Sequence, residues 1–124
     1  MREVKIKGLH HVAIHVRELD SAKEFYEDIF GLAPTKTPDN ARENGIAWYE
    51  LPDGRQLHLF ERKESTETGR AHFALEVEDL DSWQKLLRDK EIATEEPTVD
   101  LYKAKRIFIR DPSGNLFELV EWLK

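Results

Sequence analysis

The fold is decided by a stretch in the second half of the chain, His72-Phe-Ala-Leu-Glu-Val-Glu-Asp-Leu-Asp-Ser82, because an earlier stretch has the same pattern. The earlier one reads His11-Val-Ala-Ile-His-Val-Arg-Glu-Leu-Asp-Ser21. Both begin with histidine, carry alanine and valine at matching places, and end in Leu-Asp-Ser. Such a repeat at a constant offset indicates that the chain contains two copies of one structural unit. Each copy opens with a histidine at the same place.

Apolar and polar residues alternate along both stretches, which predicts a β-strand in each. In the first stretch the apolar residues at positions 12, 14 and 16 share the face that a helix covers, and His11 lies on the opposite face. His10 falls on the apolar face, so we expect the two adjacent histidines to have different roles. In the second stretch the same alternation places His72 opposite the apolar residues.

Each stretch continues into a short amphipathic helix and then a hairpin. Ser21 with Glu24 forms a capping-box pattern at the start of the first helix, and Asp81 with Ser82 begins the second. Turn residues at 52–54 and 111–114 separate strands at 45–51 and 55–61, and at 106–110 and 115–121. Residues 92–104 are expected to hold a further strand. Each unit therefore reads strand, helix, and two or three strands.

Composition limits the classes of protein that the chain can represent. Its 124 residues fit one compact domain, and 40% hydrophobic with 35% charged residues is typical of a soluble globular protein. A formal charge of −6 argues against a nucleic-acid partner. Neither a membrane-spanning run nor a signal-peptide pattern is present, and cysteine is absent, so a cytoplasmic location is expected.

The repeat selects four equivalent positions on the opening and closing strands, occupied by His11, His58, His72 and Glu118. Three imidazoles and one carboxylate suit a divalent first-row metal ion. A single histidine on a strand face is more often packed or solvated than a ligand. Quasi-symmetry favours the metal site, because it brings corresponding strands together around one axis.

The chain resembles the vicinal oxygen chelate superfamily, which includes glyoxalase I, methylmalonyl-CoA epimerase, fosfomycin-resistance proteins and extradiol dioxygenases. The resemblance is carried by Gly8-Leu-His-His-Val-Ala-Ile-His-Val16, Phe25-Tyr26 with Phe30-Gly31-Leu32, Ala71-His-Phe-Ala-Leu-Glu-Val77 and Asp111-Pro-Ser-Gly-Asn-Leu-Phe-Glu-Leu-Val-Glu121. It implies an α+β fold of two tandem βαβββ modules, at about 7–62 and 69–124, within a single domain spanning 1–124. The modules would form a cup-shaped, partly open mixed β-barrel with the helices outside. The family's metal ligands fall on His11, His58, His72 and Glu118.

The resemblance implies a divalent-metal-dependent enzyme, of lyase or isomerase type, whose small substrate chelates the metal through vicinal oxygens. Glu118 would be the catalytic carboxylate, and Fe, Ni, Zn and Mn remain open as the metal. Glyoxalase I usually has glutamate or glutamine at the position of His58. An Fe(II) extradiol-type dioxygenase is therefore an alternative, since such enzymes resemble this chain in His11, His72 and Glu118.

Two further alternatives follow from the resemblance. A non-catalytic small-molecule binding or resistance protein would share the fold, and a metal-bound module without turnover is also open. Fosfomycin transferase activity ranks low, because Ala13 and Phe108 stand where those enzymes carry threonine and tyrosine.

Substrate-pocket residues are expected on the repeated hairpins. Trp48 and Phe108 are equivalent and would form pocket walls, although ordinary packing explains them equally well. Tyr102 and Arg106 belong to a positive patch that would hold an anionic group of the substrate, the alternative being a solvated strand edge.

The resemblance also implies a homodimer, the arrangement common among short members of the family. Sites would be shared between chains, with His11 and His58 from one chain and His72 and Glu118 from the other.

Overall fold

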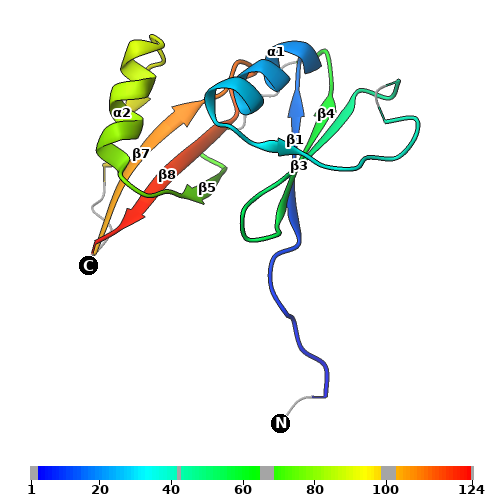
Figure 1. Ribbon diagram of the computed structural model, residues 1–124, viewed down its shortest axis with the longest axis horizontal. Helices are drawn as coiled ribbons and strands as arrows, with labels where there is room; N and C mark the ends of the chain where they lie inside the picture. Colours follow the sequence, from blue (N-terminus) through cyan, green and yellow to red (C-terminus); the bar gives the residue numbers. More distant parts are fainter. Residues whose placement is uncertain (1–2, 42, 65–68, 99–102, 124) are drawn as a thin grey trace. The chain divides into compact units, whose positions relative to one another are not determined.

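The structure is a computed structural model that describes residues 3–41, 43–64, 69–98 and 103–123. The chain forms two compact units, Met1–Lys63 and Glu64–Lys124, here called module one and module two. Figure 1 traces the elements of each along the chain. No helix among the described residues is long and apolar enough to cross a membrane.

The described part of module one contains one helical segment and four strands. Strand β1 (His11–Val16) is followed by α1 (Leu19–Lys23), which continues as a wider π-type helix, η1 (Glu24–Ile29). Strands β2 (Ala33–Pro34), β3 (Ile46–Glu50) and β4 (Gln56–Glu61) complete the module. The order across the sheet is β1-β4-β3-β2, with β1 and β4 parallel and the other pairs antiparallel.

Module two repeats this plan. Its elements are β5 (His72–Glu76), α2 (Leu80–Asp89), β6 (Thr94–Glu95), β7 (Ala104–Arg110) and β8 (Leu116–Trp122). The sheet order is β5-β8-β7-β6, again with a parallel first pair. The predicted α+β fold of two βαβββ modules is confirmed, and each module has an open four-stranded mixed sheet. The strand expected within 92–104 is the two-residue β6, and 99–102 lie outside the described residues.

The two parallel pairs have the same register. His11 stands opposite Gln56 in β1–β4, and His72 stands opposite Leu116 in β5–β8. Two residues further along each strand, Ala13 stands opposite His58 and Ala74 opposite Glu118. The sequence repeat therefore corresponds to a structural repeat, strand for strand and residue for residue.

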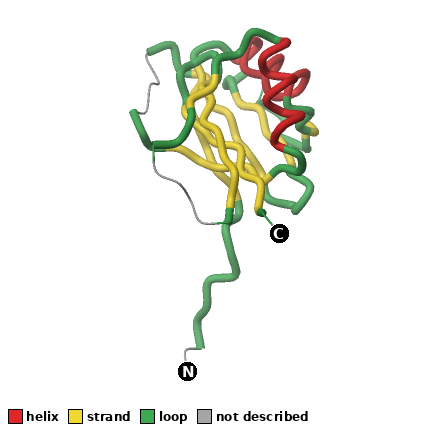
Figure 2. Tube along the Cα trace, turned by 90° about the vertical axis from the view of Figure 1, so that its left-hand side faces the viewer, coloured by secondary structure: helices red, strands yellow, loops and turns green. Residues whose placement is uncertain are grey.

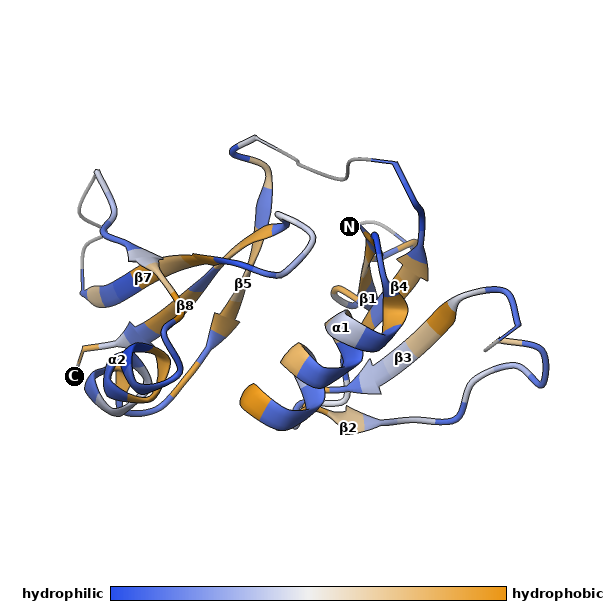
Figure 3. Cartoon of the chain, turned by 90° about the horizontal axis from the view of Figure 1, so that it is seen from above, coloured by the Kyte–Doolittle hydropathy of each residue, from blue (hydrophilic) through white to orange (hydrophobic). Residues whose placement is uncertain are grey.

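In each module the helix packs against its own sheet, α1 against β3 and β4 and α2 against β8; Figure 2 colours the helices red and the strands yellow. The covered face carries the core, and its largest fully buried side chains include Tyr26, Leu57, Leu59, Leu87, Ile107, Phe117 and Leu119. Figure 3 shows the hydrophobic positions concentrated on the strands and the hydrophilic ones on the segment that follows β4. Because side chains alternate along a strand, the residues between these core positions project from the opposite face.

The helix starts differ from the capping-box prediction, which was wrong. The backbone N–H of Leu19 donates to Glu61 Oε2 at 2.8 Å, while Ser21 Oγ donates to Glu18 Oε2 at 3.2 Å. In module two the Leu80 N–H donates to Glu121 Oε1 at 3.0 Å. A glutamate at the same place on the last strand thus accepts the first helical N–H in both modules.

The start of α2 has a second acceptor, Asp79, and the helix begins at Leu80, one residue before the expected start at Asp81. Asp79 is the N-cap, with φ of 53°, and its carboxylate accepts from the Ser82 N–H at 3.2 Å and from Ser82 Oγ at 2.6 Å. These two hydrogen bonds lower the pKa of the Asp79 carboxyl. Side-chain acceptors at the N-cap satisfy helix N–H groups that have no partner within the helix.

We expect Glu121→Ala to lower the free energy of unfolding by about 1 kcal/mol, because it leaves the Leu80 N–H without its acceptor. Urea unfolding followed by circular dichroism measures the change. Glu121→Gln, which retains an acceptor oxygen, should lose less, and the exposed Glu78→Ala should lose almost nothing. Equal stability of Glu121→Ala and Glu78→Ala would show that the contact does not support α2.

Candidate metal centre

In module one the two ligand-type histidines come from β1 and β4 and lie in contact. His58 is buried, with 5% of its surface exposed, and its ring is sandwiched. The His11 ring stacks on one face at 4.1 Å between centroids and 16° between planes. The Trp48 ring covers the other face at 4.2 Å and 11°. The predicted pocket residue Trp48 therefore lies directly against a predicted ligand.

Gln56 fixes the orientation of the His58 ring. Its Oε1 lies 2.8 Å from His58 Nε2, and an amide oxygen can only accept a hydrogen bond, so Nε2 carries the proton. The Nδ1 lone pair of His58 is then the one available to a metal. Holding the second ring nitrogen in a hydrogen bond is how proteins usually orient a ligating imidazole.

His10 lies beside His11, which contradicts the expectation that the two side chains face opposite ways. Their Nδ1 atoms are 2.9 Å apart, so one donates and the other accepts. The reason is that β1 begins at His11. His10 precedes the strand, and the alternation of strand side chains does not extend to it.

The pKa of His58 is lowered, first by burial and then by the neighbouring His11 and His10. Burial disfavours a charged imidazolium, and two further imidazoles nearby would add like charge. The lowered pKa favours the neutral form of His58, which is the form of histidine that binds metal ions.

In module two His72 and Glu118 form a close pair across β5 and β8. His72 Nε2 lies 2.9 Å from Glu118 Oε2, and the Glu118 side chain is only 7% exposed. His72 Nδ1 is 2.8 Å from the carbonyl oxygen of Arg70, which can only accept, so Nδ1 carries a proton. In the neutral imidazole the Nε2 lone pair then points at a carboxylate oxygen. Two acceptors at this distance require a proton or a cation between them.

The other predicted pocket residues of module two surround this pair. Arg106 Nη1 is 3.5 Å from Glu118 Oε2, and the Phe108 ring meets the His72 ring edge-on at 5.1 Å. The guanidinium of Arg70 lies 5.1 Å from the Phe108 ring centroid. Tyr102, the fourth predicted pocket residue, lies outside the described residues.

Each module thus brings together two of the four predicted ligands. Among the described residues there is no group of three or more His, Cys, Asp or Glu side chains arranged to hold a metal ion. Sequence reasoning missed three contributors, which are Gln56, His10 and the Arg70 carbonyl. Gln56 could have been found, since it stands two residues before His58 on the same strand face. The Arg70 carbonyl could not have been found in this way, because every residue has a backbone carbonyl whatever its side chain.

Comparison with known proteins identifies the family. A model described as the Glyoxalase/Bleomycin resistance protein/Dioxygenase superfamily matches residues 8–119. The chain belongs to this family.

Individual proteins are also similar to this chain. The uncharacterized protein YaeR of Escherichia coli (strain K12) is 31% identical over 125 residues, covering 94% of this chain and 97% of YaeR. The metallothiol transferase FosB of Staphylococcus haemolyticus is 29% identical over 120 residues, covering 92% and 83%. A crystal structure of a putative glyoxalase family protein from Bacillus anthracis, 24% identical, superposes with a TM-score of 0.86 over 98% of this chain and 99% of that one.

We expect the imidazole signal of His58 in the metal-free protein to titrate below pH 6.5, because burial opposes protonation. As the pH falls below 6.5, the unfolded chain takes up this proton before the folded one does, so the free energy of unfolding should decrease. NMR titration measures the pKa, and His58→Gln identifies the signal by its loss. A His58 signal titrating at or above 6.5 would contradict the burial argument.

Proposed function

We propose that this protein is a divalent-metal-dependent enzyme of the lyase or isomerase type, acting on a small substrate that offers two adjacent oxygens. The observation that carries the proposal is the His72–Glu118 pair, whose Nε2 and Oε2 face each other at 2.9 Å. With the Nδ1 proton of His72 held by the Arg70 carbonyl, these two atoms form half of a cation site.

We propose that the remaining donors complete the coordination of the same ion. His58, held by Gln56 and kept neutral by burial, offers Nδ1, and His11 lies against it. Together with His72 and Glu118 they supply three imidazole nitrogens and one carboxylate, a set suited to Fe, Ni, Zn or Mn. When bound, such an ion supplies Lewis acidity that stabilises negative charge on a substrate oxygen.

Glu118 is the residue that we propose moves a proton. Its buried carboxylate stands next to the substrate position, where it can take a proton from one carbon or oxygen and return it to another. Arg106 Nη1, at 3.5 Å, offsets the buried negative charge. The same guanidinium would hold an anionic group of the substrate, since Arg106 is 15% exposed. Trp48 and Phe108 would cover the apolar part of the substrate.

One observation favours the dioxygenase alternative. The His58 ring is enclosed by His11 and Trp48 and is hydrogen-bonded to Gln56, which would suit a packed histidine as well as a ligand. Without His58, the residues left are two histidines and one carboxylate, the triad typical of non-haem Fe(II) oxygenases. Metal analysis after anaerobic purification distinguishes the lyase or isomerase from the dioxygenase, because tightly bound iron supports the dioxygenase.

We expect the anaerobically purified protein to hold about one divalent ion per chain. His72→Ala should abolish binding, and Glu118→Gln should weaken it, as measured by mass-spectrometric metal analysis and isothermal titration. His15→Ala is the matched control, since His15 lies on the same strand face as His11 but its ring packs edge-on against Phe60. Full metal occupancy in a correctly folded His72→Ala protein would refute the proposed centre.

We further propose a homodimer in which each site takes His11 and His58 from one chain and His72 and Glu118 from the other. Mixing His11→Ala with Glu118→Ala chains should then restore metal binding, in about a quarter of the sites for random pairing. Mixing His11→Ala with His58→Ala should restore none, because both changes affect the same module. Sites built within single chains would stay inactive in both mixtures, so equal failure of the two mixtures would overturn the shared-site dimer.

A further inference from the structure

The face of module two that carries His72 and Glu118 also carries an ion pair that the proposed function does not use. The register aligns Glu95, Phe108 and Glu118 in one row across β6, β7 and β8, so their side chains project from the same face. Arg70, which precedes β5, reaches this row with its side chain. Its Nη1 lies 3.2 Å from Glu95 Oε2, and its guanidinium carbon lies 5.1 Å from the Phe108 ring centroid. The ion pair therefore connects the start of β5 with β6, the strands at the two ends of the sheet order.

The Phe108 ring lies between this guanidinium and the proposed metal centre. The His72 ring meets it edge-on at 5.1 Å between centroids, and the guanidinium carbon of Arg106 lies 5.7 Å from its centroid. Guanidinium groups are stabilised next to an aromatic ring. Two arginine side chains and the imidazole of a proposed ligand thus contact one phenyl ring, within the reach of a single small substrate.

The ion pair of Arg70 with Glu95 is open to solvent and easily exchanged. The two side chains are 62% and 58% exposed. Exposed ion pairs contribute little to stability, because water solvates the separated charges almost as well. A substrate already held at the metal centre presents its remaining groups to Arg70 at a high local concentration. An anionic group on that substrate would therefore compete well with the Glu95 carboxylate.

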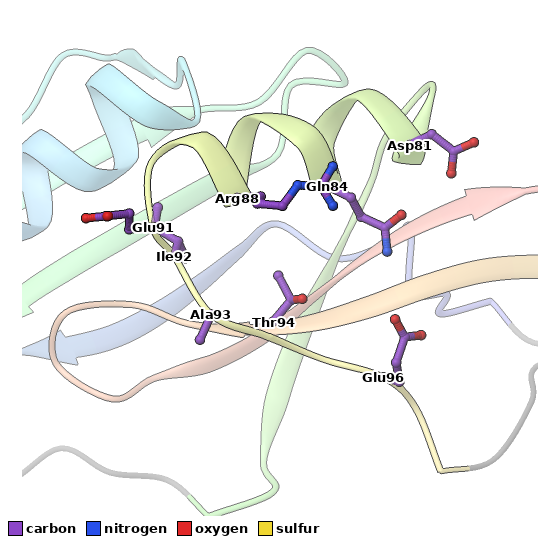
Figure 4. A pocket seen from close by; sticks show the side chains of 8 residues that line it. All are labelled: Asp81, Gln84, Arg88, Glu91, Ile92, Ala93, Thr94 and Glu96. Carbon is purple, nitrogen blue, oxygen red and sulfur yellow. The ribbon is translucent and has the colours of Figure 1, made fainter.

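A second exposed ion pair lies on the opposite face of the same sheet. Lys105 Nζ is 3.0 Å from Asp81 Oδ1. Asp81 borders a hollow of about 600 Å³ between α2 and residues 91–96, and Thr94 borders it as well (Figure 4). Because Glu95 is the next residue on β6, its side chain projects away from this hollow. The pair on the helix-covered face has the same kind of charges but lies away from the proposed ligands, so it provides a matched control.

We propose that Arg70 is a substrate-binding residue, and that the Glu95 carboxylate occupies its guanidinium in place of the substrate. The substrate class is a small oxyacid that offers two adjacent oxygens to the metal centre and carries a second anionic group, a carboxylate or a phosphate. This second group displaces Glu95 and binds Arg70 next to Arg106. The planar fork of a guanidinium matches both kinds of oxyanion. The inference rests on the proposed function and deepens it, since it names the substrate class.

Two pairs of probes test the substrate class on the full chain purified anaerobically. Malate and lactate both offer a hydroxyl next to a carboxylate, but only malate carries a second carboxylate. In the same way, 3-phosphoglycerate differs from glycerate by a phosphate. In isothermal titration we expect a dissociation constant several-fold lower for the doubly anionic member of at least one pair, and the pair with the larger ratio identifies the anionic group. Equal constants within both pairs would overturn the proposal.

The two members of the ion pair should have opposite effects on the preferred doubly anionic probe. Arg70→Gln should raise its dissociation constant by about tenfold, because it removes charge-assisted hydrogen bonds. Glu95→Gln should lower it by about two- to fivefold, because it removes the competing carboxylate. Asp81→Asn removes the same charge from the control pair and should change it little. If Glu95→Gln weakens binding as Arg70→Gln does, or strengthens it no more than Asp81→Asn, Glu95 does not stand in for the substrate.

Inorganic phosphate separates this inference from the metal proposal. In chelator-treated protein, phosphate can bind the Arg70 guanidinium but no metal ion, and the Arg70 Nε–H signal in NMR spectra reports the contact. We expect this signal to shift on titration, and to shift at lower phosphate concentrations in Glu95→Gln than in wild type. A chain that purifies without metal but shows this response would refute the metal proposal alone. A chain that purifies with metal but shows no response would overturn the role of Arg70.

Discussion

The parallel pairing of the first and last strands of each module is the constraint on which the site depends. In β1–β4 it places the imidazole of His11 against that of His58, and in β5–β8 it places His72 against Glu118. Strand side chains alternate with a period of two, so a slip of one residue would send the second member of each pair into the core. The buried leucines on either side of His58 prevent this slip, because they would be exposed by it.

The two modules have the same backbone arrangement, but the side chains at equivalent positions differ in charge. In module one the closing-strand position holds His58, an amide from Gln56 orients it, and aromatic rings enclose it. In module two the same position holds Glu118, faced by His72 and Arg106. Neutral, burial-tolerant groups thus lie in one half of the repeat and the charged group in the other. The metal centre that we propose would therefore need only one buried carboxylate, which limits the desolvation cost.

The sequence predicted the elements well because the information for them is local. The apolar–polar alternation of a strand and the turn residues of a hairpin can be recognised within a few consecutive positions. Because the pattern occurs twice in the chain, each element predicted in one copy is supported by its counterpart in the other. Predictions failed where a hydrogen-bond partner is distant in the sequence, and at the ends of strands and helices. The acceptor for the Leu19 N–H is Glu61, which a local capping pattern at Ser21 cannot reveal. His10 was misplaced because strand alternation was extended one residue past the start of β1.

The pairing of Glu61 and Glu121 with the helix starts connects the core to the site. Each glutamate stands three residues after a proposed ligand on the same strand, so it projects from the opposite face. One face of β4 presents His58 while the other holds the first N–H of α1, and β8 does the same with Glu118 and α2. Rotation of either strand about its axis would break the helix contact as it moved the ligand. The helix cap therefore helps to fix the direction in which the ligand points, and it does so identically in both modules.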